Sequence, residues 1–427
     1  MSDTRWLVLL CASRIGFSLI FTVYSALLPV LMGAWQMNAA DAGLVQSGWH
    51  IGYLISLFAA GLLTDRIGAR KTFLLMSIGA CVSAMLFATL SNGFWSALAL
   101  YFVAGAASGG SYTPVLALIS QRYGAARRGT AMGWYLAAGS FGYAVSLIAC
   151  AALAPWAGWR AALALSAIAT VAGALLGWVA LRNARDTPSH ASTLVPWLDS
   201  ARQLWKNKPA QLAIWSYSFH AWELLGMWAW LPAFLVAAAA YEGDASANPL
   251  AIGVGIAGLT HLASVIGSIA GGTLSDRIGR TGVILIMSLA SLACSFSFGW
   301  MLGAPLWLIT LVAMVYNLTA IGDSSVFSTV LSETVPPSQI GFAFSIRSVV
   351  GFGMGAISPW VFGLVLDWAG GAGNPDQSAW GLAWCSIGVG AMLGPLLTWR
   401  LHRIFSAPQY RQQLETIQTA RPSQTLE

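Results

Sequence analysis

Residues 61–70 read GLLTDRIGAR, and residues 272–281 read GTLSDRIGRT. Both stretches contain the run Asp-Arg-Ile-Gly, and Asp65 of the first copy corresponds to Asp276 of the second at an offset of 211. This offset is close to half of the 427 residues in the chain. The repeat therefore predicts two homologous halves, each carrying one copy of the motif.

Each copy of the motif follows a long apolar stretch, and similar stretches recur along the chain. The composition is 57% hydrophobic and only 8% charged, whereas soluble domains carry about 25% charged residues. About 20 apolar residues are long enough to cross a bilayer as a helix. Twelve such stretches lie near residues 6–32, 42–63, 72–91, 94–119, 130–154, 160–182, 210–239, 251–273, 282–303, 305–331, 340–366 and 379–404. We predict an all-α membrane protein with twelve transmembrane helices in two pseudo-symmetric six-helix bundles.

The longest polar segment divides the twelve stretches into equal groups. It covers residues 183–209 and contains three prolines. The predicted domains are an N-terminal bundle over 1–182, a cytoplasmic linker over 183–209, a C-terminal bundle over 210–404 and a cytoplasmic tail over 405–427. Within the linker, residues 197–206 have the pattern of a short amphipathic helix lying on the inner membrane surface.

The positions of Lys and Arg predict the orientation, because cytoplasmic segments of membrane proteins carry an excess of both. With the N-terminus inside, cytoplasmic segments hold 18 of the 21 Lys and Arg residues. Of the other three, Arg160 lies in an outer loop, and Arg14 and Arg347 lie within predicted helices. We expect a multi-pass protein of the cell inner membrane with both termini in the cytoplasm. The net charge of +6 then reflects orientation and predicts no nucleic-acid partner.

The repeated motif resembles the loop between helices 2 and 3 of the major facilitator superfamily, which recurs between helices 8 and 9. Further matching features are Gly158-Trp159-Arg160 at the start of helix 6, Arg127-Arg128-Gly129 between helices 4 and 5, and Glu333, Pro336 and Gly341 between helices 10 and 11. The resemblance implies a secondary transporter that works by alternating access. The sequence has no Walker-type phosphate loop and no nucleophile elbow, so we expect neither an enzyme nor a bound cofactor or metal.

The motif residues are expected to act as a gate. They are Gly61, Asp65, Arg66, Gly68 and Arg70 in the first copy and Asp276, Arg277 and Gly279 in the second. Helix N-termini carry partial positive charge, so Asp65 could dock against the start of helix 11 near Ile340 and Gly341. Asp276 could dock in the same way against helix 5. The alternative is that these loops only fix topology and folding.

Arg347 is the first candidate for substrate binding. An ionisable residue at membrane depth is costly and therefore suggests a function. A guanidinium can hold a carboxylate through two parallel hydrogen bonds, and a basic residue at a similar place in helix 11 resembles the oxalate/formate-type anion exchangers. The alternative is a buried pair with Asp323. Arg14 in helix 1 could be a second anion contact, or its side chain could extend to the lipid headgroups.

Two histidines also obey the repeat, because His50 and His261 are 211 positions apart and each precedes its motif aspartate by 15 residues. This places both near the bilayer centre, where they could contact an anion or simply pack. Further hydrogen bonds to a substrate could come from four polar side chains, namely Tyr24, Gln46, Tyr112 and Asn317.

Glu223 is the first candidate for carrying a coupling proton, since a carboxyl group at membrane depth favours its neutral form. His220, one helical turn away, could share that proton, and Asp323 is a third candidate. The alternative is a structural pair.

The sequence therefore predicts transport of a small organic anion, a carboxylate in particular, by proton coupling or by exchange for a counter-anion. The expected partners are this substrate, the lipid bilayer and the coupling ion, and the chain is expected to act as a monomer. The alternatives are proton-coupled efflux of amphipathic drugs or cations, in which Glu223 or Asp323 would bind the cation, and a non-transporting receptor on the same fold.

Overall fold

The computed structural model describes residues 1–184, 197–242, 248–336, 339–370 and 376–407. All regular structure within these ranges is helical, which confirms the predicted fold class. The helices are α1 Asp3–Ala34, α2 Ala39–Ile67, α3 Ala69–Leu90, α4 Phe94–Ser108, α5 Thr113–Arg122, α6 Ala125–Leu181, α7 Trp197–Lys206, α8 Lys208–Glu242, α9 Pro249–Ile278, α10 Arg280–Ser297, α11 Leu306–Gly322, α12 Ser324–Thr334, α13 Ile340–Trp368, α14 Gln377–Ala391 and α15 Leu393–Ser406.

Eleven helical stretches in the described residues are long and apolar enough to span a bilayer. One of them is α6, whose 57 residues would extend about 85 Å at 1.5 Å per residue, far more than the roughly 30 Å of a hydrocarbon core. Gly158 divides it, with a non-helical backbone at φ 80° and ψ 166°. Counting the two parts separately gives the twelve predicted crossings, and Gly158 begins the sixth crossing as predicted.

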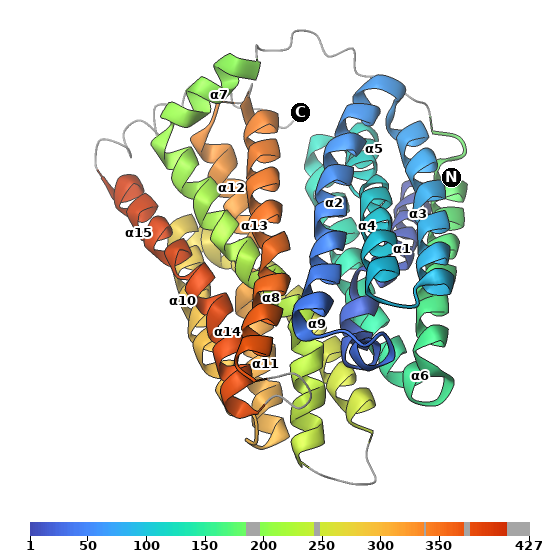
Figure 1. Ribbon diagram of the computed structural model, residues 1–427. Helices are drawn as coiled ribbons and strands as arrows, with labels where there is room; N and C mark the ends of the chain where they lie inside the picture. The colour runs from blue at the N-terminus through green and yellow to red at the C-terminus, as the bar shows by residue number, and fades with distance from the viewer. Residues whose placement is uncertain (185–196, 243–247, 337–338, 371–375, 408–427) are drawn as a thin grey trace.

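The helices form two bundles that lie side by side (Figure 1), α1–α6 in one and α8–α15 in the other. The bundles meet mainly where α2 packs against α13 and where α6 packs against α9. The amphipathic helix expected at residues 197–206 is present as α7, at the upper end of Figure 1. We call this end, where α2 and α9 finish, the linker end, and the opposite one the far end.

The two bundles are tightly packed at the far end and separated at the linker end. A Cβ atom on Gly43 or Gly363 would lie 2.2 Å or 2.1 Å from a carbonyl oxygen of the opposite bundle. A Cβ atom on Gly61 or Gly341, at the linker end of the same two helices, would meet nothing within 4 Å. The structure is therefore a state that is closed at the far end and open at the linker end.

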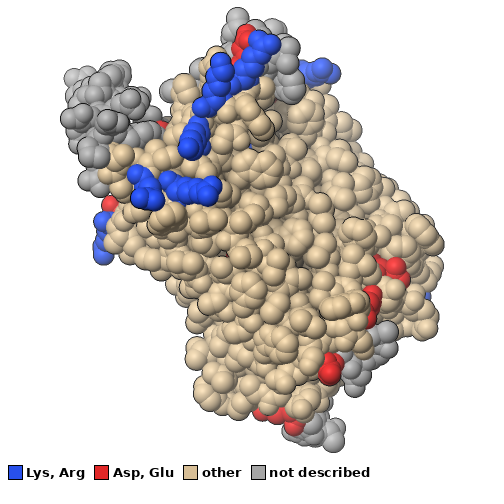
Figure 2. Space-filling view, turned by 60° about the vertical axis from the view of Figure 1, so that its left-hand side comes forward, with Lys and Arg blue, Asp and Glu red and all other residues tan. Residues whose placement is uncertain are grey.

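Charged residues segregate along the same axis. The face shown in Figure 2 carries most of its Lys and Arg side chains toward the upper end, together with a few acidic ones, whereas the charged side chains toward its lower end are mainly acidic. Three arginines counted in the predicted charge bias, Arg185, Arg411 and Arg421, lie outside the described residues, as do residues 185–196 of the predicted linker and residues 408–427 of the predicted tail.

Candidate functional site

A cavity of about 480 Å³ lies between the two bundles. Its walls come from α1, α2, α4, α5 and α6 on one side and from α8, α11, α12 and α13 on the other. A second space of about 300 Å³ between α2 and α13 shares Leu57, Tyr112, Phe344 and Ser348 with it and reaches Gly61 and Asp65. The cavity is thus continuous with the gap at the linker end.

Arg14 of α1 lines one wall of the cavity. Its Nη1 donates to the Ser111 hydroxyl at 2.9 Å and to the Ser111 carbonyl oxygen at 3.3 Å. The guanidinium lies 5.3 Å from the ring centroid of Tyr112, and Nε is buried without a hydrogen-bond partner. Only 8% of the residue is exposed, so the side chain faces the cavity and does not extend to headgroups.

Arg347 of α13 lines the wall contributed by the other bundle. Its Nη1 donates to the Ser328 hydroxyl at 2.7 Å, and its guanidinium lies 4.4 Å from the Tyr217 ring and 4.6 Å from the Phe344 ring. Nε is again buried and unpartnered. The alternative of a pair with Asp323 is not what the structure shows, since no hydrogen bond or ion pair joins these two described residues.

Asp323 instead pairs with His220. The Nδ1 atom of His220 lies 3.0 Å from Oδ1 of Asp323, and Nε2 lies 2.7 Å from the Ser324 hydroxyl. Asp323 is buried behind the histidine, and His220 lines the cavity. The pair therefore presents an imidazole to the cavity and keeps the carboxylate out of it.

Glu223 is separated from this pair although it lies on the same helix. Its carboxylate accepts hydrogen bonds from Ser295 at 2.8 Å and Ser291 at 3.0 Å, and the Ser295 hydroxyl also lies 2.6 Å from that of Tyr316. Glu223 thus lies between α8, α10 and α11 and is not a lining residue of the central cavity.

Four aromatic side chains close the cavity toward the far end, and we call them the aromatic floor. They are Phe21, Trp49, Tyr143 and Trp228, and all four line the cavity. The Phe21 ring lies 4.6 Å from Tyr143 and 4.7 Å from Trp49, and Tyr143 lies 5.6 Å from Trp228. Because these rings come from both bundles, the floor spans the interface.

The two repeat-related histidines are fully buried against this floor. The His50 ring lies 5.8 Å from Phe21, and the His261 ring lies 5.2 Å from Trp228. Neither histidine lines the cavity, and the Nδ1 atom of each has no hydrogen-bond partner. In this state the aromatic floor separates both imidazoles from the two arginines.

The four other polar candidates divide into one cavity residue and three supporting residues. Tyr112 lines the cavity. The Tyr24 hydroxyl donates to the Ala42 carbonyl oxygen at 3.0 Å, and Gln46 Nε2 lies 3.4 Å from His50 Nε2. Asn317 accepts a hydrogen bond from Trp228 Nε1 at 3.0 Å and so helps to position one ring of the floor.

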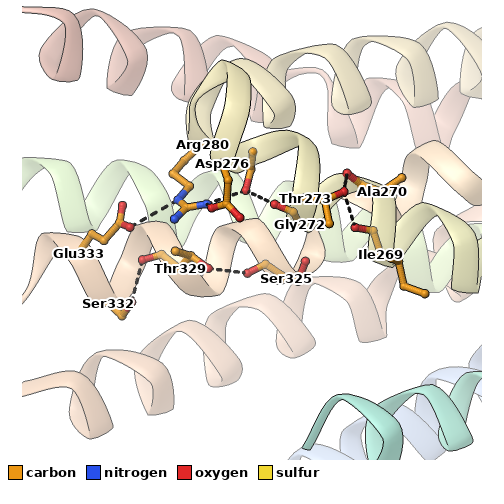
Figure 3. A network of polar contacts seen from close by, with 11 residues as sticks. Ile269, Ala270, Gly272, Thr273, Asp276, Arg280, Ser325, Thr329, Ser332 and Glu333 are labelled. Atoms are coloured by element: carbon orange, nitrogen blue, oxygen red, sulfur yellow. Dashed lines mark hydrogen bonds and ion pairs between the residues drawn. The ribbon is translucent and has the colours of Figure 1, made fainter. Parts of the chain in front are cut away.

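The two motif copies have different surroundings. Gly68 and Gly279 end α2 and α9 with φ of 92° and 88°, a backbone conformation that favours glycine. Asp65 is exposed beside the open gap, and no hydrogen bond or ion pair joins it to another described residue. Asp276 instead forms an ion pair with Arg280, whose Nε lies 3.4 Å from Glu333 (Figure 3). Arg70 donates through Nε to the Leu181 carbonyl oxygen at 2.9 Å, and Arg66 and Arg277 are exposed.

Several cavity residues could not be predicted from the sequence. Tyr53, Tyr217 and Phe352 line the cavity, but an aromatic residue in an apolar stretch cannot be assigned to lipid, core or cavity without coordinates. Ser328 likewise acquires its role only through Arg347. The repeat does not identify them either, because Tyr53 and Ser328 correspond to Ser264 and Ala117 at the offset of 211, and the match of Phe352 with Phe141 does not show which phenylalanine lines a cavity.

Comparison with known proteins agrees with this architecture. The family model described as Major Facilitator Superfamily matches residues 10–359, which is well over half of the chain. The chain therefore belongs to the major facilitator superfamily. It is a multi-pass membrane transporter and not an enzyme.

Several individual relatives and structures are similar over most of the chain. A probable sulfoacetate transporter of Cupriavidus necator is 26% identical, covering 87% of this chain and 89% of the relative. The hexuronate transporter of Bacillus subtilis is 22% identical, covering 86% and 89%. A crystal structure of a D-xylose-proton symporter superposes with a TM-score of 0.76 at 15% identity, covering 94% of this chain and 98% of that one. The structural likeness supports the fold alone.

Proposed function

We propose that this transporter moves a small organic anion, specifically a carboxylate, across the inner membrane by alternating access. The observation that carries the proposal is the pair of guanidiniums on opposite walls of one cavity. Arg14 and Arg347 come from different bundles, and each retains a buried Nε without a partner. Buried unpaired donors are costly, and a carboxylate supplies the acceptors that both side chains lack.

The remaining candidates act around these two arginines. Tyr112 adds a hydroxyl at the cavity wall, and the substrate lies above the aromatic floor. When the bundles rock, the floor separates and gives the anion access to His50 and His261, whose unpartnered Nδ1 atoms supply hydrogen-bonding groups. Tyr24, Gln46 and Asn317 hold the helices and rings of this layer in place.

Proton coupling uses the acidic residues of the C-terminal bundle. The His220–Asp323 pair exchanges a proton with the cavity, because His220 is the member that lines it. Glu223 is occluded among Ser291, Ser295 and Tyr316 in this state and would need helix movement to exchange its proton. The same cycle can run as symport or as exchange for a counter-anion.

Orientation and gating follow from the charge pattern and the open gap. The linker end is cytoplasmic, with both termini on that side, and the protein works as a monomer. Asp65 docks against the start of α13 near Ile340 and Gly341 when the linker end closes, and Asp276 docks against the start of α6. Gly61, Gly68 and Gly279 provide the close approach and the helix ends that this docking needs.

Two considerations favour an anion over an amphipathic cation. The cavity presents two guanidiniums, while Glu223 and Asp323 are turned away from it. In addition, two similar proteins are named for acids, sulfoacetate and hexuronate.

The test is binding of a carboxylate panel to purified protein, measured as a thermal shift. We expect Arg347→Ala to abolish stabilisation by any carboxylate that stabilises the wild type, Arg347→Lys to weaken it about tenfold because the bidentate geometry is lost, and Arg160→Ala to leave it unchanged. Arg160 is the matched control because its guanidinium lies at the far end beside Asn92. If Arg347→Ala binds as well as the wild type, the anion site is wrong.

A further inference from the structure

We infer that the anion carries a ring-bearing, apolar body with few or no hydroxyl groups, and that the cavity selects against polyhydroxylated acids. The inference rests on the proposed function, because it takes the two arginines as the anion site and asks what the remaining wall can hold.

The wall is aromatic to an unusual degree for a polar cavity. Ten of the 25 residues that line it are Phe, Tyr or Trp. Tyr53 of α2 and Phe352 of α13 come from different bundles, and their rings lie 6.0 Å apart. A planar body can pack against such faces with offset or edge-to-face geometry, and 480 Å³ lies within the range of small-molecule sites.

The wall also lacks amide and carboxylate side chains. None of the lining residues of this cavity is Asn, Gln, Asp or Glu. The same holds for an adjoining space of about 450 Å³ that shares Arg14 and Arg347. Amide and carboxylate side chains are the ones that can pair with several substrate hydroxyls at once.

The serine hydroxyls at the wall are already engaged. Five of the six lining serines hydrogen-bond within the protein, namely Ser18, Ser108, Ser111, Ser324 and Ser328. The sixth, Ser348, and the hydroxyls of the four lining tyrosines, Tyr53, Tyr112, Tyr143 and Tyr217, are the groups left for substrate hydroxyls. Each substrate hydroxyl that reaches none of them would lose its water without gaining a partner and would lower affinity about tenfold.

The anionic group and the body therefore have separate places. The guanidinium of Arg347 lies over the rings of Tyr217 and Phe344, and the residue lines the cavity. A carboxylate held there and at Arg14 leaves the body in contact with the aromatic floor. Arg14 and Arg347 thus bind the charged group of the substrate, and the aromatic rings contact its body.

The test compares three acids on purified wild-type protein by isothermal titration calorimetry. They are benzoate, cyclohexanecarboxylate and quinate, the last being a cyclohexanecarboxylate that carries four hydroxyls. We expect the first two to bind at least about a hundredfold more tightly than quinate. Phe352→Ala should weaken benzoate binding about tenfold, whereas Trp95→Ala, which removes a ring exposed on the outer surface, should not change it.

The outcomes separate this inference from the proposed function. Quinate binding as tightly as cyclohexanecarboxylate, with both lost in Arg347→Ala, would overturn the ring selectivity and leave the anion site intact. Benzoate binding that is indifferent to Arg347→Ala would overturn the anion site itself. If none of the three acids binds but a short aliphatic carboxylate does, the inference about the body also fails.

Discussion

The α2–α13 pair has an aspartate near each of its two ends, and the surroundings of the two aspartates differ. At the far end, both carboxylate oxygens of Asp367, near the end of α13, accept hydrogen bonds from the first backbone N–H groups of α2, at 2.9 Å from Ala39 and 2.8 Å from Ala40. At the linker end, Asp65, near the end of α2, faces the start of α13 across an open gap. Asp367 caps a helix of the opposite bundle, whereas no hydrogen bond or ion pair joins Asp65 to another residue in the described part of the chain.

This difference suggests how the structure holds one state. Because the two helices run antiparallel, each ends beside the start of the other. A rocking motion that brings Asp65 to the start of α13 must separate Asp367 from the start of α2, since the two contacts lie at opposite ends of the same interface. The far-end contact is therefore expected to stabilise the open linker end, and the two acids are expected to alternate.

The largest effect should come from packing at the closed end. In Gly363→Ala the new methyl group would lie 2.1 Å from the Ala39 carbonyl oxygen, so the helices must move apart. Such overpacking typically costs about 1–3 kcal/mol, and we expect a clearly lower unfolding temperature in detergent. Gly61→Ala is the matched control, because nothing lies within 4 Å of its Cβ position. Equal loss in both variants would show that the two ends do not differ as described.

A smaller effect is expected from the cap itself. Asp367→Ala removes two charge-assisted hydrogen bonds between the bundles, worth about 1 kcal/mol for a helix cap. The closed linker end should then gain population by roughly fivefold. The change can be measured with a cysteine introduced at Ser345, which lines the linker-end gap, in a variant from which the five native cysteines have been removed. Closure of the gap should slow alkylation of this cysteine by a maleimide.

The control for this variant is Asp376→Ala. Asp376 also caps a helix, accepting from Ala379 at 2.8 Å, but the helix is α14 of its own bundle. Removing that cap should lower stability without changing alkylation at residue 345. If both variants slow alkylation equally, the inter-bundle contact is not what holds the state.

The comparison also shows which features the sequence could predict. The twelve crossings, the kink at Gly158 and the glycine ends of α2 and α9 follow from local rules, that is, apolar length and the φ values that favour glycine. The repeat located both motif aspartates at the same end. None of this needed knowledge of the neighbouring helices.

The site could be predicted only in part, because its contacts join helices far apart in the chain. Costly intramembrane charges pointed to Arg14 and Arg347, and both line the cavity. The same rule could not show that Glu223 lies among serines of α10, since a helix sequence does not state which face meets the cavity. The role of Asp367 was missed for a similar reason. An acidic residue near the end of a helix is common, and the sequence does not show which backbone groups it contacts.

The smallest effect on stability is expected from the motif aspartates, and the two copies should differ. Asp65→Asn removes a charge that has no partner among the residues that the structure describes, so the unfolding temperature should not change. Asp276→Asn breaks an exposed ion pair, but Arg280 keeps Ser275 at 2.8 Å and Glu333 at 3.4 Å, so the cost should stay below about 1 kcal/mol.

The two variants should differ in the opposite order in their effect on transport. Asp65 can cap α13 only in the closed state, so Asp65→Asn should slow substrate flux in proteoliposomes several-fold and leave alkylation at residue 345 fast. A larger loss of flux in Asp276→Asn would show that the paired copy, not the free one, is the working gate.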